Sequence, residues 1–95
     1  MKKVTFKSRF LLDLERMRKA LGRDFEIETF IHVAELLAAG REVPSNFRPH
    51  ALSGEWTGYS EFHLDADWLV IYQDRRDEVV FWRSGTHREL FGKPG

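Results

Sequence analysis

Three strands in close succession are predicted by WTGYSEFHLDADWLVIYQDRRDEVVFWR, residues 56–83. The segment is rich in β-branched and aromatic residues, and we expect strands at about 56–64, 68–73 and 79–83. DRRD, at 74–77, has the composition of a hairpin turn. The second half of the chain is therefore expected to form an antiparallel meander.

A short strand and a helical hairpin are predicted before the meander. KVTFK, at 3–7, alternates like a strand, and Ser8 is a candidate N-cap for a helix from about 9 to 21. Asp24 is expected to cap a second helix that continues to about residue 39. Each helix has one apolar face, so we expect both to pack on one face of the sheet and to leave the other face free for a site.

A proline-containing loop is expected to join the hairpin to the meander. It covers 41–53 and holds Pro44 and Pro49, which disfavour both helix and strand. Residues 86–91 are expected to form one helical turn or an ordered tail. These elements predict an α+β fold of order β-α-α-β-β-β, with a helical hairpin on one face of a mainly antiparallel sheet. We expect a single domain over residues 1–95.

The composition limits the class of protein. Ninety-five residues, 42% of them hydrophobic, provide one core and no second. Cysteine is absent, which excludes disulfides, thiolate metal sites and thiol nucleophiles. The first ten residues, MKKVTFKSRF, lack the apolar core of a signal peptide, and no apolar run is long enough to span a membrane. We therefore expect a cytoplasmic protein without a membrane partner.

Charge is distributed unevenly although the formal net charge is zero. Residues 1–23 contain eight basic and two acidic residues, a net charge of +6, and the remaining 72 residues balance it. One helix face is expected to gather four of the basic residues, Arg9, Arg16, Lys19 and Arg23. Such a face suits a polyanion, either RNA or an acidic protein segment, and the alternative is a solvated helix surface.

Three of the four histidines lie in the second half of the chain together with an aspartate and an arginine: His50, His63, His87, Asp67 and Arg83. Imidazole exchanges protons near neutral pH, and a guanidinium can bind a phosphate through two parallel hydrogen bonds. Cleavage of RNA by its own 2′-hydroxyl needs a base, an acid and positive charge at the phosphate. The cluster offers candidates for all three, so we expect a small RNA-cleaving enzyme.

A metal centre is the less favoured interpretation of this cluster. His50, His63, Asp67 and His87 have suitable ligand groups. Their spacing is not that of a compact ligand motif, because His63 and Asp67, four apart, align on a helix but not on a strand and turn. We therefore expect neither a metal nor a cofactor.

Two aromatic residues neighbour the candidate catalytic positions. Trp68 follows Asp67, and Phe91 lies four residues after His87. An aromatic ring at such a place can stack on an unstacked nucleobase, so we expect both rings to bind substrate. The other large rings of the meander are expected to pack in the core or on strand surfaces: Trp56, Tyr72, Phe81 and Trp82.

The run from residue 50 to residue 92 closely resembles the YafQ-like branch of the RelE/ParE toxin superfamily. Three pieces carry the resemblance: H-x-L-x-G-x-W-x-G-Y at 50–59, H-x-x-x-D-W at 63–68 and R-x-G-T-H-x-x-L-F-G at 83–92. The N-terminal half is similar only in its layout. The resemblance implies a RelE-like fold, which agrees with the arrangement predicted from the residues.

The resemblance implies the toxin of a type II toxin-antitoxin pair, a ribosome-dependent mRNA endonuclease (mRNA interferase) that cuts A-site codons without a metal. Attack by the 2′-hydroxyl would leave a 2′,3′-cyclic phosphate and a 5′-hydroxyl. The active-site positions of the family fall here on His50, His63, Asp67 and His87, and Trp68 and Phe91 match family positions beside them. We expect His50 to act as base and His87 as acid, with the reverse order left open. We expect Arg83 to hold the phosphate, and His63 and Asp67 to orient or share the proton transfers.

The resemblance also implies partners. An antitoxin, often with a ribbon-helix-helix DNA-binding domain, is expected to wrap the toxin, and operator DNA would be reached only through that complex. The ribosome and mRNA would be further partners, and the basic face of the first helix would dock on ribosomal RNA. Two other functions stay open: a ParE-like inhibitor of DNA gyrase without enzyme activity, and an inactive homologue that only binds the antitoxin.

Overall fold

The computed structural model describes residues 1–92, so residues 93–95 of the predicted domain lie outside the described part. Its helices and strands are β1 (Lys3–Phe6), α1 (Ser8–Leu21), α2 (Ile27–Ala38), β2 (His50–Ala51), β3 (Ser60–Asp65), β4 (Trp68–Asp74), β5 (Glu78–Gly85) and α3 (His87–Phe91). Three 3-10 turns join them: η1 (Gly22–Asp24), η2 (Ser45–Phe47) and η3 (Gly54–Trp56). None of the helices in this part of the chain has the length and apolar character needed to cross a membrane.

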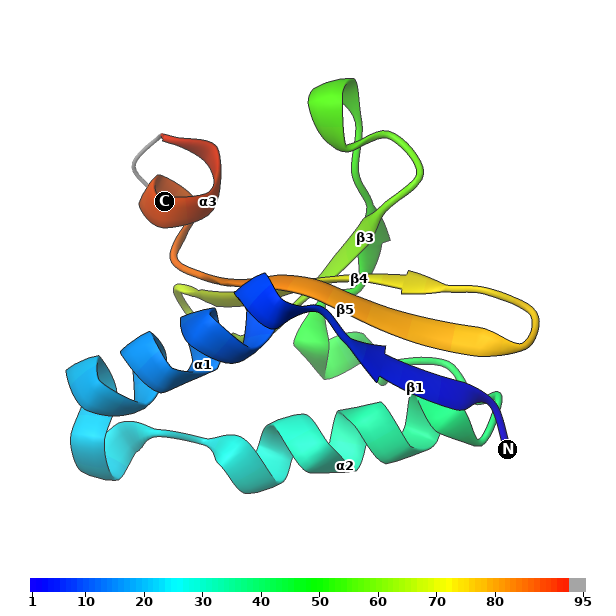
Figure 1. The fold of residues 1–95 in the computed structure, drawn as a ribbon, viewed down its shortest axis with the longest axis horizontal. Coiled ribbons are helices and arrows are strands. Elements are labelled where there is room, and N and C mark those ends of the chain that lie inside the picture. The colour runs from blue at the N-terminus through cyan, green and yellow to red at the C-terminus, as the bar shows by residue number, and fades with distance from the viewer. Residues whose placement is uncertain (93–95) are drawn as a thin grey trace.

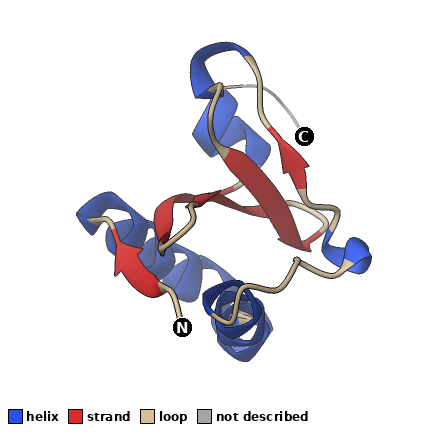
Figure 2. Cartoon of the chain, turned by 90° about the vertical axis from the view of Figure 1, so that its right-hand side faces the viewer, coloured by secondary structure: helices blue, strands red, loops and turns tan. Residues whose placement is uncertain are grey.

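The strands form one sheet in the order β1-β5-β4-β3-β2. β1 runs parallel to β5, and the other neighbouring strands are antiparallel. Helices α1 and α2 cover one face of this sheet, whereas α3 and η3 lie on the opposite side (Figure 1). In the perpendicular view the strands lie between helices on both sides (Figure 2). The predicted α+β class, the helical hairpin on one face and the mainly antiparallel sheet are confirmed.

Alternation along β4 builds two apolar clusters. Trp68, Val70 and Tyr72 pack into the cluster beneath α1 and α2, and Leu69 and Ile71 pack into a second cluster on the other face. Residues of other segments complete the second cluster: Leu52, Trp56, Tyr59, Trp82, Leu90 and Phe91. The face that we expected to be free is therefore partly covered, because α3 and η3 are anchored on it.

The helix starts differ from the expectation. Helix α1 begins at Ser8 itself, with Lys7 as the N-cap, and Asp24 lies in η1 instead of capping α2. Helix α2 begins at Ile27 after Glu26, and neither N-cap residue makes a side-chain capping hydrogen bond. Packing of the apolar helix faces, rather than capping, therefore sets where these helices begin.

The strand expected at 56–64 begins only at Ser60, and the short strand β2 precedes it. The chain turns between the two strands through η3, where Gly54 and Gly58 adopt φ values of 67° and 95° that favour glycine. Strand β2 follows Pro49 directly, and the prolines of this segment had indicated a loop. This extra strand matters because it carries His50 to the sheet edge beside β3.

Candidate active site

Three histidines from separate elements lie in a row. His50 belongs to β2, His63 to β3, and His87 begins α3. The ring centroids are 6.1 Å apart between His50 and His63, and 5.8 Å apart between His63 and His87. The sheet register brings the first two together, because β2 pairs with β3 so that His50 lies opposite Glu61, two residues before His63. The structure thus brings together the three histidines that the sequence singled out, with His63 in the middle.

Glu61 is a buried carboxylate that serves two of these imidazoles. Its side chain is 4% exposed, and its Oε1 lies 2.7 Å from Nε2 of His50 and 3.7 Å from Nε2 of His63. Its Oε2 is buried and has no hydrogen-bond partner among residues 1–92. Sequence reasoning missed Glu61, although its position two residues before His63 on the same strand face was the available signal.

The same three side chains are the residues that could hold a metal ion. One ligand atom from each of His50, Glu61 and His63 lies within 4.8 Å of the others. Two imidazoles and a carboxylate form a donor set that suits zinc or copper. A bound ion would occupy nitrogens that otherwise exchange protons, so metal binding and acid-base chemistry compete at this place.

Arg48 supplies the guanidinium next to the histidines, and sequence reasoning did not identify it. Its Nη2 lies 3.0 Å from Nδ1 of His63. Arginine can only donate, so Nδ1 of His63 accepts and the imidazole is held neutral with its proton on Nε2. Burial lowers the pKa of His63 below its ordinary value, and the nearby Arg48 lowers this pKa further. No sequence pattern pointed to Arg48, because it reaches His63 from the end of η2 in a left-handed conformation, with φ 49°.

Asp67 orients His87 at the other end of the row. One oxygen, Oδ1, lies 3.1 Å from Nδ1 of His87 and also accepts from the backbone N–H of His87 at 3.0 Å. These bonds stabilise the carboxylate, and the backbone N–H of His87 is the main cause of the lowered pKa of Asp67. With Nδ1 donating to Asp67, Nε2 of His87 remains available to exchange a proton with a substrate.

Arg83 does not occupy the position that we expected. Its Nε donates to Oδ2 of Asp13 at 2.7 Å, and its side chain is 22% exposed. Asp13 lies fully buried on α1 and also accepts from the backbone N–H of Ser84 at 3.0 Å. A buried carboxylate needs such compensation. Arg83 therefore ties β5 to α1, which corrects its expected place on the phosphate, and Arg48 is the arginine in contact with the histidine row.

Trp68 is also a correction. Its side chain is buried, with 2% exposure, and stacks on Phe25 at a centroid distance of 5.1 Å. Its Nε1 donates to Oγ of Ser84 at 2.7 Å. A ring enclosed in this way has no face for a nucleobase, because β4 turns it toward α1 and α2. The ring that lies beside the histidines is Phe91, whose centroid is 6.0 Å from that of His87.

The basic face expected on α1 is only partly free. Nε of Arg9 lies 3.5 Å, and Nη2 of Arg16 3.2 Å, from Oδ1 of Asp13. Arg16 also pairs with Glu89 of α3 at 3.0 Å. Arg16 therefore turns toward the protein, which corrects its expected place on a solvated stripe. The other two members of the stripe are exposed: Lys19 and Arg23.

Comparison with known proteins gives this arrangement a family. The family model described as the bacterial toxin of type II toxin-antitoxin systems, YafQ, matches residues 2–92. The chain belongs to the YafQ toxin family. A relative from Escherichia coli, named mRNA interferase toxin YafQ, is 40% identical over 50 residues, which cover 53% of this chain and 54% of that protein.

Solved structures of similar proteins agree with membership of the YafQ family. The structure of the Escherichia coli DinJ-YafQ complex contains a chain that is 27% identical, with a TM-score of 0.83 over 97% of this chain and 100% of that chain. A copper-bound mutant toxin from Helicobacter pylori is 31% identical, with a TM-score of 0.84 over 96% and 100% of the two chains. The predicted family and the RelE-like fold are thereby confirmed.

A pocket of about 650 Å³ opens beside the histidine row of this YafQ family member. Its lining comes from the segment around η3 and from α3: Leu52, Ser53, Glu55, Trp56, His87, Leu90 and Phe91. His87 belongs both to the row and to the pocket wall. The candidate site therefore combines proton-transfer groups with an adjoining hollow that has both polar and aromatic walls.

Proposed function

We propose that the chain is an endoribonuclease that cuts mRNA at the ribosomal A site, as the toxin of a type II toxin-antitoxin pair. The observation that carries the proposal is the row of three imidazoles with a carboxylate at each end, Glu61 on His50 and Asp67 on His87. Two carboxylate-imidazole pairs supply the two proton transfers that RNA cleavage needs. The name of the Escherichia coli relative, mRNA interferase, supports this reaction class.

In the proposed reaction one histidine removes the proton of a 2′-hydroxyl, and the resulting oxygen attacks the adjacent phosphorus. The bond from phosphorus to the 5′-oxygen breaks, and a second histidine donates a proton to that oxygen. The products are a 2′,3′-cyclic phosphate and a 5′-hydroxyl. Every proton that moves is taken up or supplied by an imidazole, so the step balances without a metal ion.

The hydrogen bonds favour His87 as base and His50 as acid, the reverse of the order expected from the sequence. His87 keeps Nε2 available while Asp67 holds Nδ1. Both nitrogens of His50 face acceptors, Nε2 at 2.7 Å from Glu61 and Nδ1 at 3.3 Å from the carbonyl oxygen of Ala51. An imidazolium donates to both acceptors, and its Nδ1 proton, held only by the longer 3.3 Å contact, is the one that would pass to the 5′-oxygen. Arg48 and neutral His63 lie between the two and stabilise the charged phosphate.

The proposed partners are a cognate antitoxin, the ribosome and mRNA. The structure of a DinJ-YafQ complex supports an antitoxin for this member of the family. Operator DNA would be bound only within the toxin-antitoxin complex. The exposed basic residues of the first 23 positions, with Arg9, Lys19 and Arg23 at α1 and η1, are proposed to meet ribosomal RNA.

Primer-extension mapping of mRNA in a translation reaction tests the function. Cuts should appear at codon positions, require ribosomes, persist in a chelator that removes zinc and copper but leaves magnesium, and weaken by about a hundredfold or more in His87→Ala. His32→Ala, a change in an exposed histidine on α2, is the matched control and should cut normally. Ribosome-independent cuts, or cutting by His87→Ala at the wild-type rate, would contradict the proposal. A fall in gyrase activity without any cut would favour the ParE-like alternative.

The pH dependence of the cleavage rate tests the assignment of base and acid. A base must be deprotonated, so His87→Ala should remove the rise of residual activity on the acidic side. An acid must be protonated, so His50→Ala should remove the fall on the basic side. If His50→Ala instead removed the rise on the acidic side and His87→Ala the fall on the basic side, His50 would be the base and His87 the acid, as expected from the sequence.

A further inference from the structure

The pocket beside His87 has the shape and chemistry of a site for a flat aromatic ligand. Its volume of about 650 Å³ lies within the range of roughly 300–1,000 Å³ that is common for small-molecule sites. Leu52 and Leu90 contribute aliphatic wall, and Trp56 and Phe91 contribute aromatic wall.

The two aromatic rings of the pocket wall, Trp56 and Phe91, lie perpendicular to each other. Their centroids are 6.4 Å apart at an interplanar angle of 87°, and Trp56 in turn meets Tyr59 edge-on at 5.1 Å. A flat group that stacks on one of two perpendicular rings presents its edge to the other, an arrangement that aromatic pairs favour. Phe91 also lies against His87, so a group stacked here would be next to the proton-transfer nitrogen.

We infer that this pocket binds one nucleobase next to the scissile phosphate and that Glu55 selects a base with N–H donors on its edge. The inference deepens the proposed nuclease and rests on it. The occupant follows from continuity with the site, because His87 lines the pocket and an RNA strand held for cleavage there must place a neighbouring base within reach.

Glu55 is the residue that would recognise the base through hydrogen bonds. Glu55 lines the pocket and is exposed, and its carboxylate can only accept hydrogen bonds. A negative group beside an RNA strand repels phosphates, so it favours binding only where a base donates to it. Guanine offers two adjacent donors, N1–H and the N2 amino group, that match both oxygens. Uracil offers one N–H between two carbonyl oxygens and is the poorest fit. The preferred occupant is therefore guanine.

Reporter mRNAs that differ only in the bases flanking the scissile phosphate test the inference on ribosomes. Wild-type protein should prefer guanine over uracil about tenfold at one flanking position, as expected for a paired contact to a base edge. Glu55→Gln should reduce this preference to near equality while cutting continues. Glu35→Gln, a change in an exposed acid on α2, is the matched control and should keep the preference. An unchanged preference in Glu55→Gln would overturn the inference.

Binding of mononucleotides separates failure of the pocket from failure of the nuclease. In the free protein 3′-GMP should shift the NMR signal of the Trp56 indole N–H far more than 3′-UMP does, and Phe91→Leu should weaken that response. A selective shift without any cleavage would support the nucleobase pocket and contradict the proposed nuclease function. Cleavage without a shift, and without an effect of Glu55→Gln, would leave the nuclease and reject the pocket.

Discussion

The guanidinium of Arg48 helps to hold the central histidine, His63, in its neutral form. It donates to Nδ1 of His63 at 3.0 Å and adds to the effect of burial in lowering the pKa of that imidazole. We expect Arg48→Ala to raise the pKa of His63, because the positive neighbour is removed. NMR titration of the histidine ring signals measures this directly. Arg75→Ala, in the exposed β4–β5 turn, is the control and should leave the titration of His63 unchanged.

His63 also makes the stability of the folded protein depend on pH. The folded pKa of His63 is below its unfolded value of 6.5, so the unfolded chain takes up the proton first as pH falls. Stability contributed at this site is complete above pH 6.5 and is lost as pH falls toward the folded pKa. Urea midpoints at pH 7.5 and 5.5 should therefore differ less in His63→Asn than in wild type. An equal difference in both proteins would exclude His63 as a source of acid sensitivity.

Trp68 and Phe91 were both expected to bind substrate, but they lie in different surroundings. Trp68 is buried in the core, whereas Phe91 lines the pocket. Trp68→Phe removes the indole donor to Ser84 within the core, so we expect a loss of roughly 1–3 kcal/mol in the free energy of unfolding. Phe91→Leu changes a half-buried ring of the pocket wall and should chiefly reduce cleavage. Urea denaturation and cleavage rates measured on both variants check this contrast. If Trp68→Phe were as stable as wild type but did not cleave mRNA, Trp68 would have to contact the substrate.

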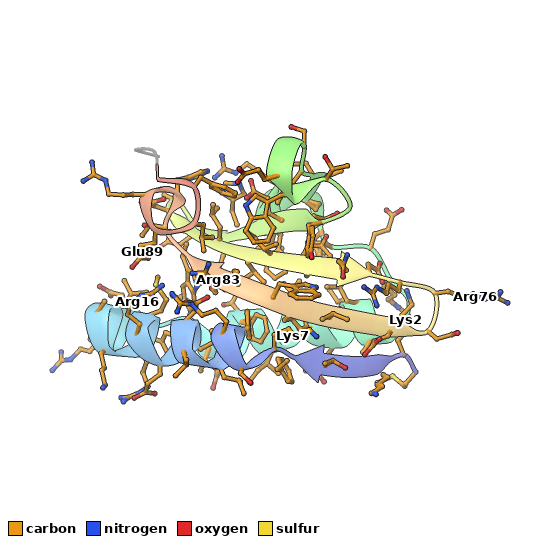
Figure 3. All side chains as sticks on the ribbon, turned by 45° about the horizontal axis from the view of Figure 1, so that its top comes forward. Lys2, Lys7, Arg16, Arg76, Arg83 and Glu89 are labelled. Carbon is orange, nitrogen blue, oxygen red and sulfur yellow. The ribbon has the colours of Figure 1, made fainter. Side chains whose placement is uncertain are left out.

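At the scale of elements, α1 controls where α3 begins. Thr86 and Glu89 form a capping box, in which Oε1 of Glu89 accepts from the Thr86 backbone and Oγ1 of Thr86 accepts from that of Glu89. Oε2 of Glu89 pairs with Nε of Arg16 at 3.0 Å, an ion pair without hydrogen-bond alignment. Figure 3 shows Arg16, Arg83 and Glu89 at this junction. Gly85 permits the contact, because a Cβ there would lie 2.9 Å from Oε1 of Glu89.

We therefore expect Arg16→Gln to misplace His87, the first residue of α3. The cleavage rate should fall about tenfold, since small displacements of a catalytic group are costly. The free energy of unfolding should also fall, by roughly 1–3 kcal/mol, because Arg16 pairs with the buried carboxylate of Asp13 as well as with Glu89. The NMR signal of the His87 ring should shift, and Arg16→Lys should restore part of the rate. Arg18→Gln breaks the exposed pair with Glu15 on the same helix and is the matched control. Equal effects of Arg16→Gln and Arg18→Gln would refute the link.

At the scale of the whole molecule, the uneven charge is both structural and available for binding. Asp13 engages Arg9, Arg16 and Arg83, so part of the positive N-terminal charge holds the helices and sheet together. The exposed remainder, which includes Lys19 and Arg23, is available for the proposed contact with ribosomal RNA. Surface charge of this kind acts on association and its salt dependence rather than on the fold.

Charge reversal at Lys19 and Arg23 together should weaken sedimentation with ribosomes and flatten its salt dependence, because fewer phosphates are neutralised. Cleavage should fall in parallel, and the thermal midpoint should stay close to that of wild type. Reversal of Arg75 and Arg76, in the β4–β5 turn, is the matched control and should leave ribosome binding intact. Unchanged sedimentation after reversal at Lys19 and Arg23 would exclude this surface as the contact.

The residues by themselves determined the element order apart from β2, the two amphipathic helices, the meander and the presence of a histidine cluster. These features follow from periodicity and composition over short stretches, which near neighbours encode. The three motifs between 50 and 92 also indicated the family, which the comparison confirmed. The roles of the candidate site residues stay predictions, because geometry places groups but does not measure their chemistry.

Only the tertiary structure decided which groups meet. Arg48 contacts His63 from 15 positions away, and Arg83 turns to Asp13 from 70 positions away. Trp68 is buried because β4 is covered on both faces, which its local sequence does not show. Such contacts depend on how separate elements pack, and one strand offset or one left-handed residue redirects a side chain. The sequence therefore identified the imidazoles. Only the packing of separate elements showed that Arg48 and Glu61 contact them and that a pocket lies beside His87.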